Sequence, residues 1–575
     1  METTTAPAAQ RGSGFHALTR RQLIWTIVGL QVTLLLAALD ATIVGTAMPQ
    51  IIAQLSGFDR YAWVTTAFML TSTIGVPIFG KLSDIYGRKW IFLGGAVLFV
   101  VASALCGAAG DLPLPGDGMN QLIAFRGLQG LGAGMITGLV FTIVGDIFPP
   151  SERGKYQGLF SGVWGLASIF GPTLGGWITD NLSWRWCFYV NLPVGVVAIA
   201  ILYFAFPYFK PEGTRRAIDY AGALTLTAGM VPLLLALTWV TSYGWTSTRV
   251  MGLLAVAAVM LGAFLFAETR AAEPILPLSL FRNPVISVSS IALFLTGFGM
   301  FGSILFIPLF MQGVIGISAT QSGSLLTPMM MMMVVGTITS GQLISRLGRY
   351  RVLALVGLGL MGVGMLLLAG MGTDTTRTIV VRNMLVIGVG LGLTMPLYTL
   401  VVQNAVPYRM MGAGTAATQF FRSIGGTLGA AVLGSVMLSR YTGHFDAIVP
   451  AGTPPQVLGI FRNPLQLTQV LPQLREQFGA IPNGQQLLQT LLVNVRDSLA
   501  YSLQGVFLAS AILVGVAFVS SFFLKEIALR KTVGEQPSSA PPPAESPVAP
   551  AGLGQAEQAE TREPAIPAGA GRGDD

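Results

Sequence analysis

Long apolar segments recur along almost the whole chain, and they constrain its fold more than any other feature of the sequence. Each run of about 20 residues is long enough to cross the apolar core of a bilayer as one helix. Only 10% of the 575 residues are charged, whereas a soluble protein of this size carries about 25%. Within lipid every backbone amide must be paired inside its own segment, so such spans form helices. The sequence therefore predicts an all-α polytopic membrane protein.

Fourteen such spans are expected. They cover residues 23–48, 61–80, 90–110, 120–145, 155–178, 187–208, 217–240, 249–267, 286–311, 320–345, 351–371, 378–402, 412–437 and 500–524.

The distribution of positive charge predicts the orientation of these spans. An even number places both chain ends on the same side of the membrane. Twenty lysines and arginines fall in segments on that side, whereas the short loops on the other side contain only Arg60, Arg185, Arg249 and Arg377. Because cytoplasmic loops are enriched in lysine and arginine, we expect both termini in the cytoplasm. The net charge of +8 then reflects topology, and we expect no nucleic-acid partner.

A weak internal repeat predicts two bundles. Three segments of the first half are similar in sequence to three segments of the second half. Their starting residues are Gly80 and Gly341, Arg126 and Arg382, and Gly171 and Gly425, at offsets of 261, 256 and 254 residues. Parallel repeats of this kind place a substrate site at their interface. The expected units are a cytoplasmic tail (1–22), an N-terminal six-helix bundle (23–208), two extra helices with linkers (209–285), a C-terminal six-helix bundle (286–525) and a disordered cytoplasmic tail (526–575).

A long outer loop is expected at residues 441–499, inside the C-terminal bundle. Its end, LLQTLLVNVRDSL, is compatible with a short amphipathic helix on the outer surface or with a simple connector.

The polar stretch GKLSDIYGRKW, at residues 80–90, resembles the loop between the second and third helices of the major facilitator superfamily. The resemblance implies two six-helix bundles with two extra helices between them. It also implies that Asp84 and Arg88 form a latch that stabilises the outward-open state. The expected latch comprises Gly80, Asp84, Gly87, Arg88 and Lys89. The alternative is a solvated loop that only sets topology.

Asp40 is the carboxylate that lies well inside an apolar span, in LAALDATIVG. A charge at this depth costs about 2.5–3.5 kcal/mol on insertion scales, so an intramembrane acid indicates function. Desolvation raises and a nearby cation lowers the pKa of a carboxyl, which makes Asp40 a candidate proton carrier. The stretch resembles the first-helix motif of fourteen-span drug:proton antiporters. A structural ion pair is the alternative.

Arg126 is the expected partner of Asp40. Arg126 lies about 10 Å from the outer end of its span. Asp40 lies about 24 Å from the inner end of its own span. In an apolar core of about 30 Å, both residues are therefore at similar depths. RGLQGLGAG, starting at Arg126, resembles the fourth-helix motif of the family, whose arginine is tied to proton coupling. Arg382 and Arg422 also lie within apolar spans, where either can serve as a structural charge.

The stretch ASIFGPTLGGWITD resembles the antiporter motif of exporters, with Ala167 where the commonest form has Gly. Small residues allow close helix approach, and proline is tolerated where neighbours satisfy the freed backbone. We expect Gly171, Pro172, Gly175 and Gly176 to form a kinked, smooth face on which the other bundle rocks.

The sequence predicts no enzyme, no cofactor and no metal site. Cys106 and Cys187 are too few for a metal cluster or a disulfide framework. His16 and His444 lie outside the spans, which argues against a histidine proton relay. The proton gradient is the expected energy source.

The resemblance implies a drug:proton antiporter of the multidrug exporter type, in a bacterial inner (plasma) membrane, acting as a monomer. It would exchange a small amphipathic compound for protons by alternating access, and an acid in its path would favour cations. Export of a lipid, glycolipid or secreted metabolite is the second interpretation. A membrane scaffold or sensor that transports nothing is the third. The substrate-binding residues are not predicted.

Overall fold

The computed structural model describes residues 19–55, 61–208, 219–317, 319–407, 410–450 and 484–529, with a few isolated positions in between, and these residues contain helices and no strands. The helices are α1 (Arg20–Leu55), α2 (Tyr61–Tyr86), α3 (Arg88–Gly107), α4 (Gly118–Ile147), α5 (Pro150–Asn181), α6 (Trp186–Tyr189), α7 (Asn191–Ala205), α8 (Tyr220–Tyr243), α9 (Thr248–Arg270), the 3₁₀ helix η2 (Leu278–Arg282), α10 (Pro284–Gly313), α11 (Ala319–Leu347), α12 (Arg351–Ala369), α13 (Arg377–Ala405), α14 (Met411–Ile448) and α17 (Gly484–Ser521).

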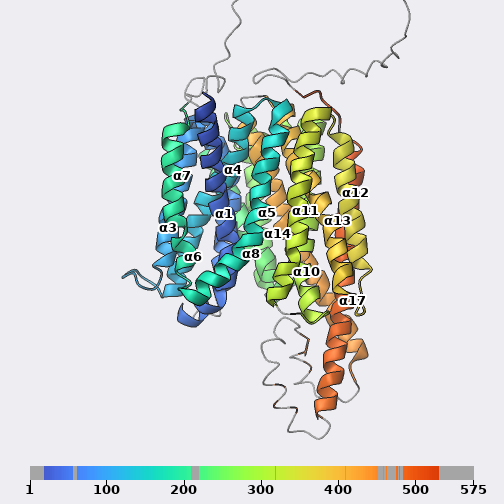
Figure 1. The fold of residues 1–575 in the computed structure, drawn as a ribbon. Coiled ribbons are helices and arrows are strands. Elements are labelled where there is room, and N and C mark those ends of the chain that lie inside the picture. The colour runs from blue at the N-terminus through green and yellow to red at the C-terminus, as the bar shows by residue number, and fades with distance from the viewer. Residues whose placement is uncertain are drawn as a thin grey trace, which may run out of the picture.

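The helices form two halves that stand side by side (Figure 1). In the N-terminal half α4 packs against α2 and α3, while α1 packs against α5 and α7. In the C-terminal half α13 packs against α11 and α12, while α10 packs against α14 and α17. The two halves meet mainly where α5 contacts α11 and where α14 contacts α2. This arrangement confirms the predicted fold class.

The two extra helices lie beside the junction of the halves. α8 packs against α9, α2 and α14. Trp63 of α2 meets Trp239 of α8 edge to face, with ring centroids 6.0 Å apart. Much of α9 faces outward, with Val259 and Phe266 more than half exposed, as a lipid-facing helix requires.

Thirteen helices are long and apolar enough to cross a membrane among the described residues. The predicted span that is not among these thirteen is the fifth, 155–178, which corresponds to α5; this helix has 32 residues but is more polar. Its lower apolarity is due in part to glycines, which carry no apolar side chain: Gly154, Gly158 and Gly165. The sixth predicted span is made of α6 and α7 together, which Val190 joins with helical φ and ψ angles.

The prediction of an outer loop at 441–499 was too long. Helix α14 continues to Ile448 and α17 begins at Gly484, so both project beyond the rest of the bundle, as Figure 1 shows for α17. LLQTLLVNVRDSL is the first part of α17 and not a separate surface helix. The physical reason is lateral packing: Tyr441 and Phe445 of α14 are fully buried, as is Leu491 of α17, and the Asn494 amide donates to the Ile448 carbonyl at 3.1 Å.

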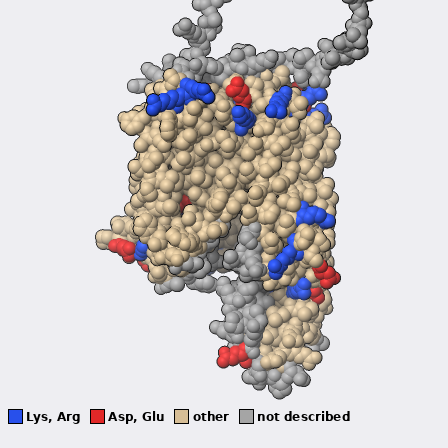
Figure 2. Space-filling view, viewed as in Figure 1, with Lys and Arg blue, Asp and Glu red and all other residues tan. Residues whose placement is uncertain are grey.

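The end of the bundle that carries the turn between α2 and α3 is called the inner end below, in line with the predicted orientation. Lysine and arginine gather along this end, whereas a broad belt with little charge follows it (Figure 2). The surface is hollowed between the two halves toward the opposite, outer end (Figure 2).

The two halves touch backbone to backbone at the inner end. A Cβ added at Gly341 of α11 would overlap the carbonyl of Gly154 in α5, and one at Gly158 would lie 2.8 Å from the Thr337 carbonyl. The Gln157 amide donates to Gln403 of α13 at 2.7 Å. Glycine is needed here because only small residues let helices approach this closely. The inner end is therefore closed.

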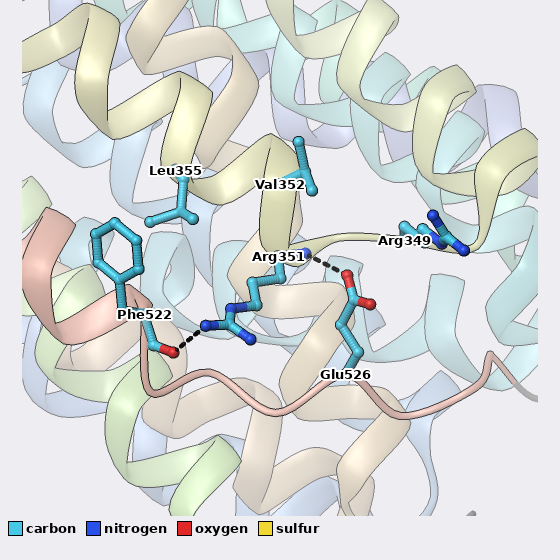
Figure 3. A pocket seen from close by; sticks show the side chains of 6 residues that line it. All are labelled: Arg349, Arg351, Val352, Leu355, Phe522 and Glu526. Carbon is cyan, nitrogen blue, oxygen red and sulfur yellow. Dashed lines mark hydrogen bonds between the residues drawn. The ribbon is translucent and has the colours of Figure 1, made fainter. Parts of the chain in front are cut away.

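The segment after α17 lies across the inner end of the C-terminal half. The buried Tyr350 hydroxyl donates to the Lys525 carbonyl and accepts from the Ile527 amide, both at 2.7 Å. Figure 3 shows the adjoining groove, where the Arg351 side chain donates to the Phe522 carbonyl at 2.6 Å. Burial raises the pKa of Tyr350 to about 12.

Replacing Gly341→Val should force α5 and α11 apart at the inner end. We expect a cysteine placed at Ser345, which faces Gly154, to react severalfold faster with a water-soluble maleimide applied from the inner side. Both native cysteines are buried and should stay silent. Gly262→Val is the matched control, because a Cβ there meets nothing within 4 Å. Equal labelling in both variants would contradict the closed contact.

Replacing Tyr350→Phe removes both hydrogen bonds to the segment after α17. Each is worth about 0.5–1.5 kcal/mol, so trypsin should cut after Lys525 several times faster. In the wild type the neutral hydroxyl is favoured by folding, so this contribution is complete below pH of about 10, the ordinary tyrosine pKa, and is lost as pH rises through about 12. Tyr220→Phe, at an exposed position, should change nothing. Unchanged cleavage in Tyr350→Phe would contradict this role.

Candidate functional site: a buried ion pair and an inner latch

Asp40 of α1 and Arg126 of α4 form an ion pair inside the N-terminal half. The Arg126 Nη1 to Asp40 Oδ2 distance is 2.5 Å, and the two side chains are 2% and 0% exposed. Glycines in the run after Arg126 allow this contact: a Cβ at Gly130 would overlap the backbone of α2, and one at Gly132 would crowd that of α3. Helix α4 thus lies close enough for its arginine to reach across the bundle.

Three polar side chains from three helices complete the cluster around the ion pair. Gln129 of α4 donates to Asp40 Oδ1 at 2.9 Å and to Ser103 of α3 at 2.6 Å. Asn191 of α7 donates to the same Asp40 oxygen at 3.1 Å. Arg126 Nη1 also donates to Gln129 Oε1 at 2.6 Å. Both carboxylate oxygens of Asp40 are therefore hydrogen-bonded, as burial of a charge requires.

Arg126 is also held from its other side. Its guanidinium carbon lies 4.1 Å from the centre of the Phe68 ring of α2, and Nε donates to the Val64 carbonyl at 3.3 Å. Helices α1, α2, α3, α4 and α7 thus meet at one neutral cluster. A proton on Asp40 would remove the charge that balances Arg126, so protonation and helix packing are physically linked here.

Arg88, the first residue of α3, binds two carboxylates at the inner end. Arg88 Nη1 lies 2.5 Å from Asp84 Oδ1 of α2, and Arg88 Nε lies 2.8 Å from Asp146 Oδ2 of α4. Arg88 also donates to the Ser83 hydroxyl at 2.6 Å. The three charged side chains are 12%, 4% and 2% exposed. The inner ends of α2, α3 and α4 are thereby joined by one nearly buried charge network.

This network reaches the other half through Asp84. A Cβ on Gly412, the second residue of α14, would overlap the Asp84 carboxylate, and a Cβ on Gly80 would lie 2.7 Å from Ala416. A carboxylate at the first turn of a helix interacts favourably with the helix dipole. Asp84 therefore links α2 to the C-terminal half as well as to Arg88.

The remaining residues of the expected latch have different positions. Gly87 connects α2 to α3 with a φ of +91°, a conformation that favours glycine. Lys89 points away from the carboxylates and donates to the Tyr203 carbonyl of α7 at 2.7 Å. Lys89 thus makes a different contact from Arg88, because consecutive residues at a helix start point in different directions, and its role in the latch stays a prediction.

The exporter-like stretch of α5 packs mainly within its own half. A Cβ at Gly171 would overlap the Thr42 hydroxyl of α1, and Gly175 accepts a hydrogen bond from Thr179. A Cβ at Gly176 would meet nothing within 4 Å. The side chain of Pro172 lies outside the described residues. The closest approach of α5 to the other half lies earlier, at Gly154, Gly158 and Gly165, and a smooth face at the exporter-like stretch stays a prediction.

Several residues of these two networks were not predicted. Asp146 lies directly after the predicted span 120–145, at the end of α4. Gln129 and Asn191 lie within predicted spans, where a buried amide is a usable signal, and Gln129 belongs to the RGLQGLGAG motif itself. Gly412 carries no chemical signal, because its role depends on a neighbour more than three hundred residues away in the chain.

The chain forms two bundles of membrane-length helices, and the N-terminal bundle contains a buried charge pair. This architecture is that of a membrane transport protein rather than an enzyme. The family profile of the Major Facilitator Superfamily matches residues 32–430. The chain belongs to this superfamily.

Similar proteins agree with this assignment. The chain is 39% identical over 529 residues to the "Multidrug transporter protein MdtP" of Bacillus subtilis, covering 88% of this chain and 94% of that protein. It is 36% identical over 535 residues to "Multidrug resistance protein 3" of the same organism, covering 92% and 98%. Among solved structures, the human organic anion transporter MFSD10 (TETRAN) has a TM-score of 0.56 at 14% identity, covering 85% of this chain and 99% of that chain.

The proton:xylose symporter XylE has a TM-score of 0.54 at 12% identity, covering 88% of this chain and 96% of that chain. At these identities both structures support the fold alone.

Replacing Asp40→Asn should destabilise the fold because it leaves Arg126 buried without a counter-charge. The expected loss is about 3–5 kcal/mol in free energy of unfolding, and the double variant Asp40→Asn/Arg126→Gln should recover part of it. Denaturant unfolding of the purified protein in detergent measures both. Asp111→Asn is the matched control, since Asp111 is 65% exposed in its pair with Arg185 and should cost less than about 1 kcal/mol. A double variant as unstable as the single one would contradict a balanced pair.

Proposed function

We propose that the chain is a proton-coupled exporter that exchanges small amphipathic compounds for protons by alternating access. The observation that supports the proposal most is the fully buried cluster in which Asp40 is bound by Arg126, Gln129 and Asn191. An ionisable residue at this depth is rarely kept without a function. Similarity to two Bacillus multidrug proteins supports export of drugs.

In the proposed mechanism Asp40 carries the proton. Protonation removes the negative charge opposite Arg126 and weakens the contact between α1 and α4. Because both residues also bind α2, α3 and α7, a change at this pair alters the packing of the whole N-terminal half. The half can then rotate against its partner, which moves the opening from the outer to the inner end.

Two contacts would hold the outward-facing state until that step. The first is the glycine contact between α5 and α11 at the inner end. The second is the Asp84, Arg88 and Asp146 network, which places a carboxylate against the start of α14. Opening the inner end separates α14 from α2 and exposes this carboxylate to water.

The proposal includes the orientation and setting expected from the sequence: a bacterial inner membrane, cytoplasmic termini and a monomer. It does not include a preference for cations, because both oxygens of Asp40 are already bound. Export of a lipid or secreted metabolite would use the same machinery and differs only in its substrate.

Inside-out vesicles with an imposed internal acid pH test the proposal. Addition of an exported compound should collapse the proton gradient in the wild type and not in Asp40→Asn, which keeps the shape of the side chain but cannot carry the proton. Loss of at least roughly tenfold in exchange rate is expected, because a coupling proton site is removed outright.

Asp446→Asn is the matched control. Its carboxylate pairs with Arg462 at the protein surface, 42% exposed, so it should exchange at the wild-type rate. A gradient that collapses equally in Asp40→Asn would place coupling elsewhere, and uptake of compounds without any proton movement would refute antiport.

A further inference from the structure

Among the residues that the structure describes, no carboxylate pairs with Arg422 of α14, a deep cation, in contrast to Arg88 and Arg126. It lies 11 residues from the start of α14, or about 16 Å along the helix, near the middle of a core of about 30 Å. Its guanidinium donates to Gln419 Oε1 and contacts Met395 Sδ of α13, with Nη1 3.0 Å from the sulfur. Neither neighbour carries a charge.

Acids are scarce in the sequence around Arg422. Residues 274–445 contain a single acidic residue, Asp374, which lies in the loop between α12 and α13 at the outer end. In the N-terminal half Asp40 is bound by Arg126, and Asp84 and Asp146 are bound by Arg88. The positive charge of Arg422 is therefore not neutralised by the spans around it.

Arg422 faces an internal space and not lipid. Every residue of α13 from Gly390 to Ala405 is buried except Met395, the residue that Arg422 contacts. On α4 every residue from Gly132 to Phe148 is buried except Thr137. A helix that faced the bilayer would expose several residues along one side. Where the residues before and after one accessible position are all buried, that position does not face the bilayer. The accessible surface at these positions therefore lines a space inside the protein.

This space lies next to the junction of the two halves. The Gln403 amide of α13 donates to the Phe141 carbonyl of α4 at 2.9 Å, which joins the halves toward the inner end. Met395 lies about 12 Å outward of Gln403 along α13, and Thr137 about 6 Å outward of Phe141 along α4. Arg422 itself is partly exposed. An uncompensated guanidinium thus reaches a mid-membrane space where the halves stop touching.

We propose that Arg422 binds an anionic group of the transported compound, so that the substrates are amphipathic acids such as carboxylates. The inference rests on the proposed export function and specifies its substrate class. A guanidinium presents five N–H donors in a planar fork that matches a carboxylate. Gln419 Oε1 accepts a hydrogen bond from the Arg422 guanidinium and orients it, while Met395 offers an adaptable apolar surface for the rest of the molecule. A carboxylate there restores electrical neutrality to the centre.

Binding of a matched pair of probes tests this assignment. Dansyl-phenylalanine carries a carboxylate, and its methyl ester has nearly the same shape without the charge. The purified full chain in lipid nanodiscs should bind the acid more tightly than the ester. Arg422→Gln should raise the Kd of the acid roughly tenfold or more, the size expected for a lost hydrogen bond to a charged group, and leave the Kd of the ester unchanged.

Two further variants separate recognition from structure. Arg422→Lys keeps the charge and should retain part of the preference for the acid. Arg382→Gln removes an equal charge from the exposed arginine that donates to Asn383 on α13, and should leave both Kd values as in the wild type. A merely structural role for Arg422 would weaken binding of acid and ester together.

Two results would overturn the inference. In the first, the wild type binds the ester or tetraphenylphosphonium as tightly as the acid. In the second, the wild type fails to bind the acid. If the proposed export function is wrong, the experiment gives a different result. In that case inside-out vesicles would accumulate none of the three probes, while the acid would still bind with a preference that depends on Arg422.

Discussion

The ion pair between Asp40 and Arg126 is the constraint on which the N-terminal half depends. Neither charge is tolerable alone in an apolar interior, and the pair is stable because every oxygen of the carboxylate is hydrogen-bonded. Helices α4 and α7 supply those bonds, while α2 and α3 hold Arg126 and Gln129 in place, so five helices converge on one point. Glycines of α4 allow its close contacts with α2 and α3. The same dependence makes the cluster sensitive to one proton, since a neutral Asp40 leaves Arg126 without its balance.

The inner end is built on a different principle. Here α5 and α11 meet through glycine backbones, so the contact is tight but contains few side chains that would have to repack when it opens. Arg88 and its two carboxylates add a charge network within the N-terminal half, and its Asp84 carboxylate lies against Gly412 of α14. A contact made of smooth backbone and one polar network can open as a unit, which suits two halves that move as rigid bodies.

Sequence reasoning recovered most of the fold because the bilayer imposes it: length and apolarity define spans without any tertiary information. It also paired Asp40 with Arg126, since equal depth can be calculated from helix rise. It failed where position depends on packing between distant segments. Gly412 opposes Asp84 and Gly341 opposes Gly154 only in the folded chain, and Lys89 could not be separated from Arg88 without the start of α3. The outer loop was overestimated because α14 and α17 stabilise each other beyond the apolar core.

We expect the charge of Asp40 to control whether the inner end is closed. Spin labels at the exposed inner-end residues Glu152 of α5 and Leu347 of α11 report the separation of the two halves as pH is lowered. In the wild type this distance should lengthen as the pH falls, and in Asp40→Asn it should be long at every pH. A distance that ignores pH in the wild type, or a pH response that survives in Asp40→Asn, would contradict it.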